Sequence, residues 1–347
     1  MDADIVVIGG GPVGMVAALY AARAGLSVVV LEPRPAPHDK ACGEGLMPGA
    51  LLALHDLGVD PPGRALRGIE YIDGRRSVSA DFSGPAGRGV RRTALHQELR
   101  AALEIAEISV IPGTAAGVEQ DADSVQVVIS GSKQGLVCRY VLAADGLHSP
   151  TRRRLGLQAK APSVRRYGLR QHFRVAPWND CVEVYWAASA EAYVTPVAED
   201  VVGVAVLTTR RGAFDEHLAD FPHLAERLTG ATPASDILGA GPLAQRVTSR
   251  VCGRILLVGD AGGYVDALTG EGLAVGFAQA EVAVQAVLLD RPAAYPRWAQ
   301  KVTWRSTALT RGLLVATQPT WGRRVTLRAA VAMPGAFRAA VSVLARS

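Results

Sequence analysis

Three glycines near the N-terminus have the spacing of a turn that binds phosphate groups. Gly9, Gly11 and Gly14 follow a short apolar stretch and begin an alanine-rich segment. Glycines at this spacing allow a tight turn, close approach to a pyrophosphate, and close packing of the next helix. Glu32 ends the following apolar stretch, where a carboxylate accepts a hydrogen bond from a ribose 2′-hydroxyl. The sequence therefore predicts a site for the ADP portion of a dinucleotide. The neighbouring residues expected to contact it are Pro12, Val13, Pro33 and Arg34.

A cysteine in the segment DKACGEGL is a second candidate for chemistry. Cys42 is followed by Gly43, Glu44 and Gly45, and the two glycines allow the backbone to pass close to a ligand. A thiol with a pKa of about 8.5 is mostly protonated at neutral pH, as a proton donor must be. Glu44 is an alternative proton source. A third interpretation is that Cys42 only fills a tight turn.

Two later motifs follow in the order expected of a flavin-binding chain. The stretch DGLHSPTRR contains Asp145 and Gly146, and the stretch VGDAGG contains Gly259 and Asp260. The alternative interpretation is that the two aspartates only cap turns. The second motif leads into a glycine-rich turn and a helix, at Gly270, Gly272 and Leu273.

With these motifs in this order, the sequence resembles the large family of FAD enzymes built like p-hydroxybenzoate hydroxylase. The resemblance implies noncovalent FAD, with Asp260 on a ribityl hydroxyl group and Arg92 on the FAD side. It also implies that residues 268–273 direct backbone N–H groups at the flavin N1/O2 edge, where negative charge appears on reduction. Asp145 and Gly146 are implied to serve both FAD and a transient donor, NADPH or NADH.

Within that family, the segment DKACGEGL and the stretch VDALTGEGLAVGFAQA resemble the geranylgeranyl reductase branch. These enzymes use reduced FAD to saturate isoprenoid double bonds, and their cysteine, here Cys42, is implied to lie near the isoalloxazine with Gly43. The resemblance implies reduction of C=C bonds in an apolar isoprenoid, lipid-like or quinone substrate. Ala267 departs from the family, which normally has proline there. The alternatives are an FAD monooxygenase acting on an aromatic or polyketide substrate and a non-catalytic flavin-binding or nucleotide-binding protein.

The pattern of elements predicts an α/β chain with two interleaved domains. Buried-type strands and helices at both ends enclose alternating strands typical of an antiparallel sheet. Residues 211–228 have the pattern of one amphipathic helix. The expected FAD-binding domain comprises 1–63, 84–160 and 246–290, the substrate-binding sheet 64–83 and 161–245, and the C-terminal helices 291–347.

Aromatic residues in the antiparallel region are candidates for a substrate pocket. Tyr185, Trp186, Tyr193 and Pro196 either line an apolar pocket beside the flavin or form the core of the sheet. Tyr193 is also a candidate proton donor. His172 shares a strand face with Arg174, which fits either an acidic head group of the substrate or a solvated surface.

Composition excludes several function classes. The chain is 49% hydrophobic and 20% charged, and we expect a cytoplasmic protein without a signal peptide or a membrane-spanning segment. Its four cysteines have no metal-ligand spacing, so no metal site is expected. There is no G-x-S-x-G motif and no nucleic-acid-binding module.

The C-terminal region has an uneven charge. Residues 291–347 contain ten basic residues and no acidic residue. The expected partner is an anionic membrane surface, a phosphate group on the substrate, or an acidic face of the same protein. Phe337, Val341 and Leu344 have helical spacing, so this helix is expected either to pack on the substrate domain or to lie on a membrane. The sequence leaves the oligomeric state open.

Overall fold

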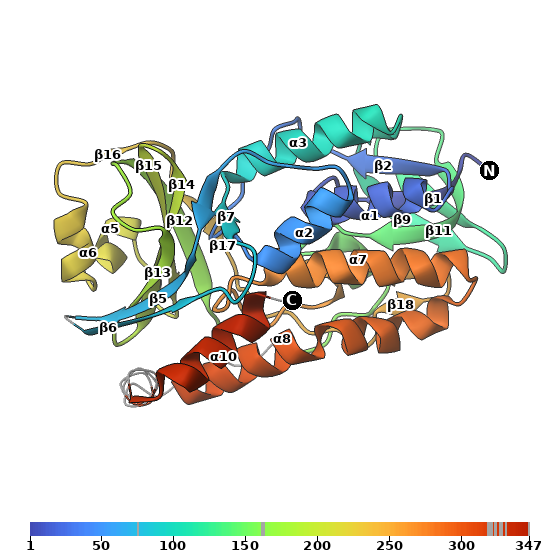
Figure 1. Cartoon of the computed structure of the whole chain (residues 1–347). Helices are drawn as coiled ribbons and strands as arrows, with labels where there is room; N and C mark the ends of the chain where they lie inside the picture. Colours follow the sequence, from blue (N-terminus) through green and yellow to red (C-terminus); the bar gives the residue numbers. More distant parts are fainter. Residues whose placement is uncertain are drawn as a thin grey trace.

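The computed structural model describes residues 1–74, 76–160, 164–317, 322, 325, 329 and 332–345. A parallel sheet covered by helices lies beside a largely antiparallel sheet, and two C-terminal helices run beneath both (Figure 1). This arrangement confirms the predicted α/β fold class. The small third sheet joins the two halves and consists of β3 (Gly45–Leu46), β4 (Arg64–Leu66) and β7 (Gly87–Gly89).

The nucleotide-binding half is built on five parallel strands with an antiparallel extension. The order across the sheet is β18-β19-β11-β1-β2-β8, and β10 and β9 continue antiparallel from β11. Ile5 and Val7 of β1 face the helices, whereas Val6 and Ile8 face the side of the extension, as side-chain alternation requires. The strands are β1 (Ala3–Ile8), β2 (Val28–Glu32), β8 (Ser109–Pro112), β9 (Ala115–Gln120), β10 (Val125–Ile129), β11 (Leu136–Ala143), β18 (Val251–Cys252) and β19 (Ile255–Leu257).

Glycine allows the helices of this half to approach each other closely. A Cβ atom on Gly276 would lie 2.4 Å from a methyl carbon of Val13, so the Val13 side chain packs directly against the backbone of Gly276. This contact brings the two helix N-termini together. The helices are α1 (Pro12–Arg23), α2 (Pro48–Asp56), α3 (Arg92–Ile105), α4 (Pro150–Arg154) and α7 (Gly272–Leu288), with short 3₁₀ turns η1 (Gly259–Gly262) and η2 (Pro292–Ala294).

The second half is a sheet with the order β16-β12-β15-β14-β13-β5-β6, with β17 added to β12. Residues 68–73 and 76–81 form an antiparallel strand pair. This pair joins the sheet because Tyr71 pairs in parallel with Val184. One face, with Tyr193 and Ala205, turns toward the C-terminal helices, and the other packs on α5 (Phe214–Leu218) and α6 (Pro222–Arg227). The strands are β5 (Gly68–Asp73), β6 (Arg76–Asp81), β12 (Tyr167–Arg174), β13 (Cys181–Trp186), β14 (Ala190–Ala198), β15 (Val201–Thr208), β16 (Thr232–Pro233) and β17 (Leu238–Ala240).

The single helix predicted over residues 211–228 is wrong. Two short helices occupy this region, α5 (Phe214–Leu218) and α6 (Pro222–Arg227). Pro222 has no backbone N–H and disfavours a helical conformation at Phe221, which has φ −122° and ψ 69°. The amphipathic pattern continues across the break because both helices cover the same face of the sheet.

The C-terminal region contains α8 (Tyr295–Thr317) and α10 (Pro334–Ala345), which lie along the lower side of the molecule in Figure 1. Phe337 and Val341 are buried, and the Phe337 ring centroid lies 5.0 Å from that of Tyr71. These two residues therefore pack on the substrate sheet. The side chain of Leu344 lies outside the described residues.

Candidate functional site

A cavity of about 690 Å³ lies between the two halves of the molecule. Most of the residues predicted to bind the cofactor line it, although they come from segments far apart in the sequence. They are Gly11, Pro12, Val13, Arg34, Cys42, Gly43, Arg92, Asp145, Gly146, Asp260, Gly270, Gly272 and Leu273.

Gly9 and Gly14, which are also predicted to bind the cofactor, do not line the cavity but form a tightly packed turn next to it. Gly9 has φ +108°, and a Cβ atom there would lie 2.5 Å from the Ala144 carbonyl oxygen. A Cβ on Gly14 would lie 1.9 Å from the Gly9 carbonyl oxygen. At Gly11 the nearest atom, Nη2 of Arg92, would be 3.9 Å away, which leaves room beside the start of α1. The turn therefore has the close packing and the open side that a bound pyrophosphate requires.

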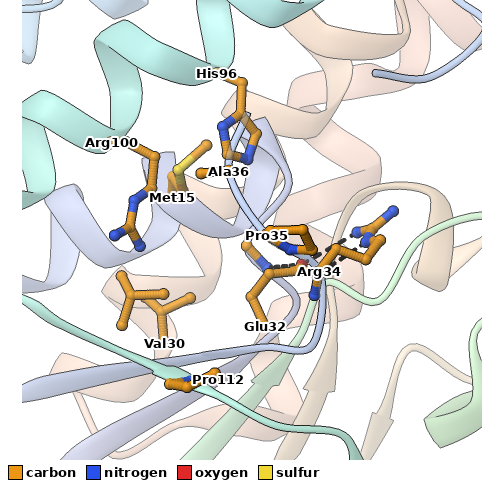
Figure 2. Close-up of a pocket in the computed structure, with 11 residues that line it drawn as sticks. Met15, Val30, Glu32, Arg34, Pro35, Ala36, His96, Arg100 and Pro112 are labelled. Carbon is orange, nitrogen blue, oxygen red and sulfur yellow. Dashed lines mark hydrogen bonds and ion pairs between the residues drawn. The ribbon is translucent and has the colours of Figure 1, made fainter. Parts of the chain in front are cut away.

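A second cavity of about 210 Å³ lies beside Glu32 and Arg34, as Figure 2 shows. The Gly10 N–H donates to Glu32 Oε2 over 2.7 Å, and Arg34 Nε donates to Oε1 over 2.7 Å. Burial opposes the negative charge of Glu32, but these bonds give it a net lowered pKa. Arg34 lines both cavities, so one elongated ligand can extend from Gly11 to this carboxylate. Pro33 lines neither cavity.

Two histidines lie beside this region and were missed in the sequence. His38 and His96 pack edge to face with ring centroids 4.3 Å apart. Burial lowers the pKa of His38 to about 4 and also lowers that of His96, so both are neutral at pH 7. The position of His38 depends on the fold of residues 33–40, for which the sequence carries no periodic signal, whereas His96 lies on α3 and meets it only through the tertiary fold.

A buried arginine joins the two later motifs. Arg152 donates to the carbonyl oxygens of Asp260 at 3.2 Å and Ala261 at 3.0 Å. Asp145 both lines the cavity and accepts the Thr151 N–H at 2.9 Å, so its hydrogen bond to the start of α4 does not exclude contact with a cofactor. Lys40 Nζ lies 3.5 Å from Asp260 Oδ2 at the cavity wall.

The loop between η1 and α7 is held by a hydrogen bond from the substrate sheet. The Tyr193 hydroxyl donates to the Leu268 carbonyl oxygen over 2.9 Å, and Asp266 Oδ1 accepts the Leu268 N–H over 3.0 Å. Arg166 lies 3.4 Å from Asp266, but burial still raises the pKa of this carboxyl. The turn that precedes α7 is therefore held against the strand that carries Tyr193.

The half of the cavity next to the sheet is apolar. Its walls come mainly from β5, β13, β14 and β15, together with Met47, which precedes α2, and the residue 268 loop. Of the sequence-predicted substrate residues, only Tyr193 lines it. The alternation of Val182 and Val184 could have indicated a shared face, but the parallel pairing of β5 with β13 has no local signal. The apolar lining residues include Met47, Ile69, Tyr71, Val182, Val184, Tyr193, Ala205, Leu207, Leu243 and Leu268.

The other substrate candidates lie elsewhere in the sheet. Tyr185 points to the opposite face and donates to Glu183 over 2.8 Å. Trp186 packs edge to face on Tyr71, and Pro196 is buried in β14. His172 is fully buried, with Nε2 lying 2.6 Å from Glu44 Oε2, so it is neither on a solvated surface nor in the cavity lining.

The three candidate proton donors have different surroundings. Cys42 is half-buried in the cavity wall, and its Sγ accepts the Glu44 N–H at 3.4 Å. Glu44 has one carboxylate oxygen on His172 and the other on the Arg92 N–H at 2.8 Å. Burial raises the pKa of Tyr193 well above its usual range, and its hydroxyl hydrogen is directed at a carbonyl oxygen. Only the Cys42 thiol therefore lies in the wall without a hydrogen bond that engages its proton, among the contacts of the described residues.

The two-part fold and this glycine-bordered cavity define a dinucleotide-binding oxidoreductase of the flavoprotein class. The FAD binding domain family matches residues 2–287, and the chain belongs to this family, in the geranylgeranyl reductase-like branch of FAD-dependent oxidoreductases. A menaquinone reductase from Mycobacterium tuberculosis (strain CDC 1551 / Oshkosh) is 30% identical over 321 residues, which cover 83% of this chain and 77% of that protein.

Two further similarities agree with this assignment. Digeranylgeranylglycerophospholipid reductase 1 from Methanothermobacter thermautotrophicus is 30% identical over 307 residues, 79% of this chain and 74% of that protein. The structure of a flavoprotein/dehydrogenase from Cytophaga hutchinsonii superposes with a TM-score of 0.86 at 17% identity, covering 99% of this chain and 92% of that one. This structural similarity supports the fold.

The cavity fits FAD. The turn at Gly9 and Gly14 leaves no room for side chains, whereas Gly11 is open toward the cavity. Arg92 Nε and Asp145 Oδ1 are buried without a hydrogen-bond partner among the described residues, which supplies a donor and an acceptor for a polar ligand. Arg34 and Arg92 would hold the pyrophosphate, Glu32 the ribose, and Asp260 the ribityl chain.

Proposed function

We propose that this enzyme reduces C=C bonds of an apolar isoprenoid substrate, such as the prenyl chain of a quinone, with electrons from NADPH or NADH. The observation that carries the proposal is the apolar half of the cavity, which continues directly from the half that fits the cofactor. The apolar residues that line it contribute aliphatic and aromatic surface suited to an unsaturated hydrocarbon chain. The reductase names of two relatives support the same chemistry.

The chain's own residues have three tasks in this reaction. When bound, reduced FAD supplies a hydride to one alkene carbon. The other carbon must take a proton, and the Cys42 thiol at the cavity wall is the group whose proton is available for it. The turn held by Tyr193 and Asp266 fixes the N-terminal end of α7, whose N–H groups favour negative charge. The apolar walls exclude water from the reacting bond.

The test uses the purified holoenzyme with a menaquinone that has an unsaturated prenyl chain. Under anaerobic conditions with NADPH or NADH, we expect a product that has gained two hydrogens on the prenyl chain, detected by mass spectrometry. The control is the same reaction in air. A product that forms only in air and contains added oxygen would contradict the proposal and assign a monooxygenase. Flavin that no donor reduces would indicate a binding protein.

We also propose that α8 contacts an anionic membrane surface, from which an apolar substrate would enter. No helix in the described ranges is long and apolar enough to span a bilayer. Trp304 is 55% exposed, and the Arg305 guanidinium lies 5.5 Å from its ring centroid. Lys301 and Arg311 are exposed on the same side of the helix. Tryptophan and cations together are typical of helices at anionic lipid surfaces.

Vesicle sedimentation tests this contact. The double variant Lys301→Glu/Arg305→Glu is expected to bind phosphatidylglycerol vesicles at least about tenfold more weakly than the wild type, since each basic residue near the surface contributes about 1 kcal/mol. Binding of the wild type should also decline at high salt. Lys133→Glu/Arg211→Glu makes the same charge change at other exposed positions and should bind normally. Equal binding by both double variants would exclude α8. Arg323 and Arg324, two of the ten basic residues in 291–347, lie outside the described residues.

A further inference from the structure

The segment that carries Cys42 is anchored by a buried acid–histidine pair. His172 Nε2 lies 2.6 Å from Glu44 Oε2, and the two side chains are almost completely buried. The other Glu44 oxygen accepts the Arg92 N–H at 2.8 Å, and His172 Nδ1 lies 2.8 Å from Ser235 Oγ. Both members are therefore hydrogen-bonded on two sides. His172 belongs to β12, so this anchor joins the cysteine segment to the substrate sheet.

Two more bonds tie the same segment to this sheet. Asp39, at the start of the segment, forms an ion pair with the buried Arg170 of β12. In the middle, the Thr195 hydroxyl of β14 donates to the Gly43 carbonyl oxygen over 2.8 Å. Arg170 Nη1 also lies 2.9 Å from His172 Nδ1, so the two anchors on β12 contact each other. The segment is held at its beginning, middle and end.

The local backbone indicates that the Glu44 side chain is needed where it is. Glu44 has φ +59°, a left-handed conformation that favours glycine and costs a residue with a side chain about 1–2 kcal/mol. On the facing strand β15, a Cβ atom at Gly203 would lie 2.9 Å from Glu44 Oε2. Glycine weakens a strand interior. Two unfavourable local features therefore meet at one contact, where the lack of a Cβ atom at Gly203 makes room for the Glu44 carboxylate.

We propose that four residues are positioning residues for the Cys42 thiol: Glu44, His172, Arg170 and Asp39. They hold the thiol at a fixed position relative to the apolar half of the cavity, here called the substrate chamber. The same sheet supplies chamber walls through Tyr193 and Ala205, so the substrate and the thiol are located by one rigid element. This inference rests on the proposed role of Cys42 as the proton donor.

The rate at which iodoacetamide alkylates Cys42 in the holoenzyme reports how accessible the thiol is, and this measurement needs no substrate. Peptide mass spectrometry follows Cys42, and the half-buried Cys252 serves as an internal reference. His172→Phe should release the segment and raise the Cys42-to-Cys252 rate ratio at least about fivefold, whereas His172→Gln, which can still donate to Glu44, should raise it less. The matched control is Arg174→Gln on β12, the strand that carries His172; it breaks the exposed ion pair with Asp200 and should leave the ratio unchanged.

A second variant keeps the test decisive if the buried substitution prevents folding. Thr195→Val keeps the volume but removes the bond to Gly43, and is expected to raise the Cys42 ratio about twofold with normal FAD content. In variants that turn over the prenyl substrate, kcat should decline while KM stays unchanged, because the chamber is intact. An unchanged ratio in the folded variants would overturn the positioning role. If the variants raise the Cys42-to-Cys252 alkylation ratio but the wild-type enzyme reduces no alkene, the positioning role is supported and the proposed reaction is rejected.

Discussion

An enzyme in which Ala205 is replaced by tryptophan is expected to lose turnover of a long prenyl substrate while it keeps its FAD. Ala205 lines the apolar half of the cavity and lies opposite Tyr193 on the neighbouring strand. An indole at this position would fill space that the substrate chain needs. Displacing three methylene groups at about 0.8 kcal/mol each removes about 2.4 kcal/mol, or about fiftyfold in kcat/KM.

Two measurements separate chamber blocking from general damage. The flavin absorbance spectrum and anaerobic reduction by NADPH or NADH should be unchanged in Ala205→Trp. Leu207→Met, on the same strand and in the same wall, nearly conserves side-chain volume and should keep most activity. If the tryptophan variant turns over the prenyl substrate normally, the substrate does not occupy this half of the cavity.

The cofactor side of the site was readable from the sequence because its requirements are local. Gly9 and Gly14 must lack a Cβ atom at a turn a few residues long, and Glu32 must follow at the end of the next strand. Asp260 similarly stands in a short glycine-rich turn after a buried strand. Such signals need only neighbouring residues.

The substrate side was less readable because it depends on contacts distant in the sequence. Tyr71 reaches the chamber only because β5 pairs in parallel with β13, more than a hundred residues later. His172 has the alternation of a half-exposed strand, yet Glu44, 128 residues earlier, covers it. Tyr185 and Trp186 were both assigned to one pocket, but adjacent strand residues point to opposite faces. Tertiary contacts decided the positions of Tyr71 and His172, whereas strand alternation alone separates Tyr185 from Trp186.

Replacement of Cys42 by serine is expected to slow product formation about tenfold or more, within the range for loss of a general acid. The hydroxyl group of serine is a far weaker acid than the thiol, so it cannot deliver the proton at a comparable rate. FAD content and reduction of the flavin by NADPH or NADH should be normal, because we expect the phosphate, ribose and ribityl contacts to be made by other residues. Single-turnover kinetics with the prenyl substrate would separate the slowed second half-reaction from the unaffected first.

The other cysteines provide the controls for this result. Cys252→Ser removes a second half-buried thiol, on the edge strand β18, where residue 252 pairs with Ile255 of β19. This variant should turn over the prenyl substrate normally. Cys138 and Cys181 are buried, and burial raises the pKa of both thiols, so neither is expected to exchange protons with the substrate. Unchanged turnover in Cys42→Ser would show that this residue has only a packing role. The proton would then have to come from Glu44 or Tyr193, and because each is engaged in hydrogen bonds, either source would require those bonds to break during turnover.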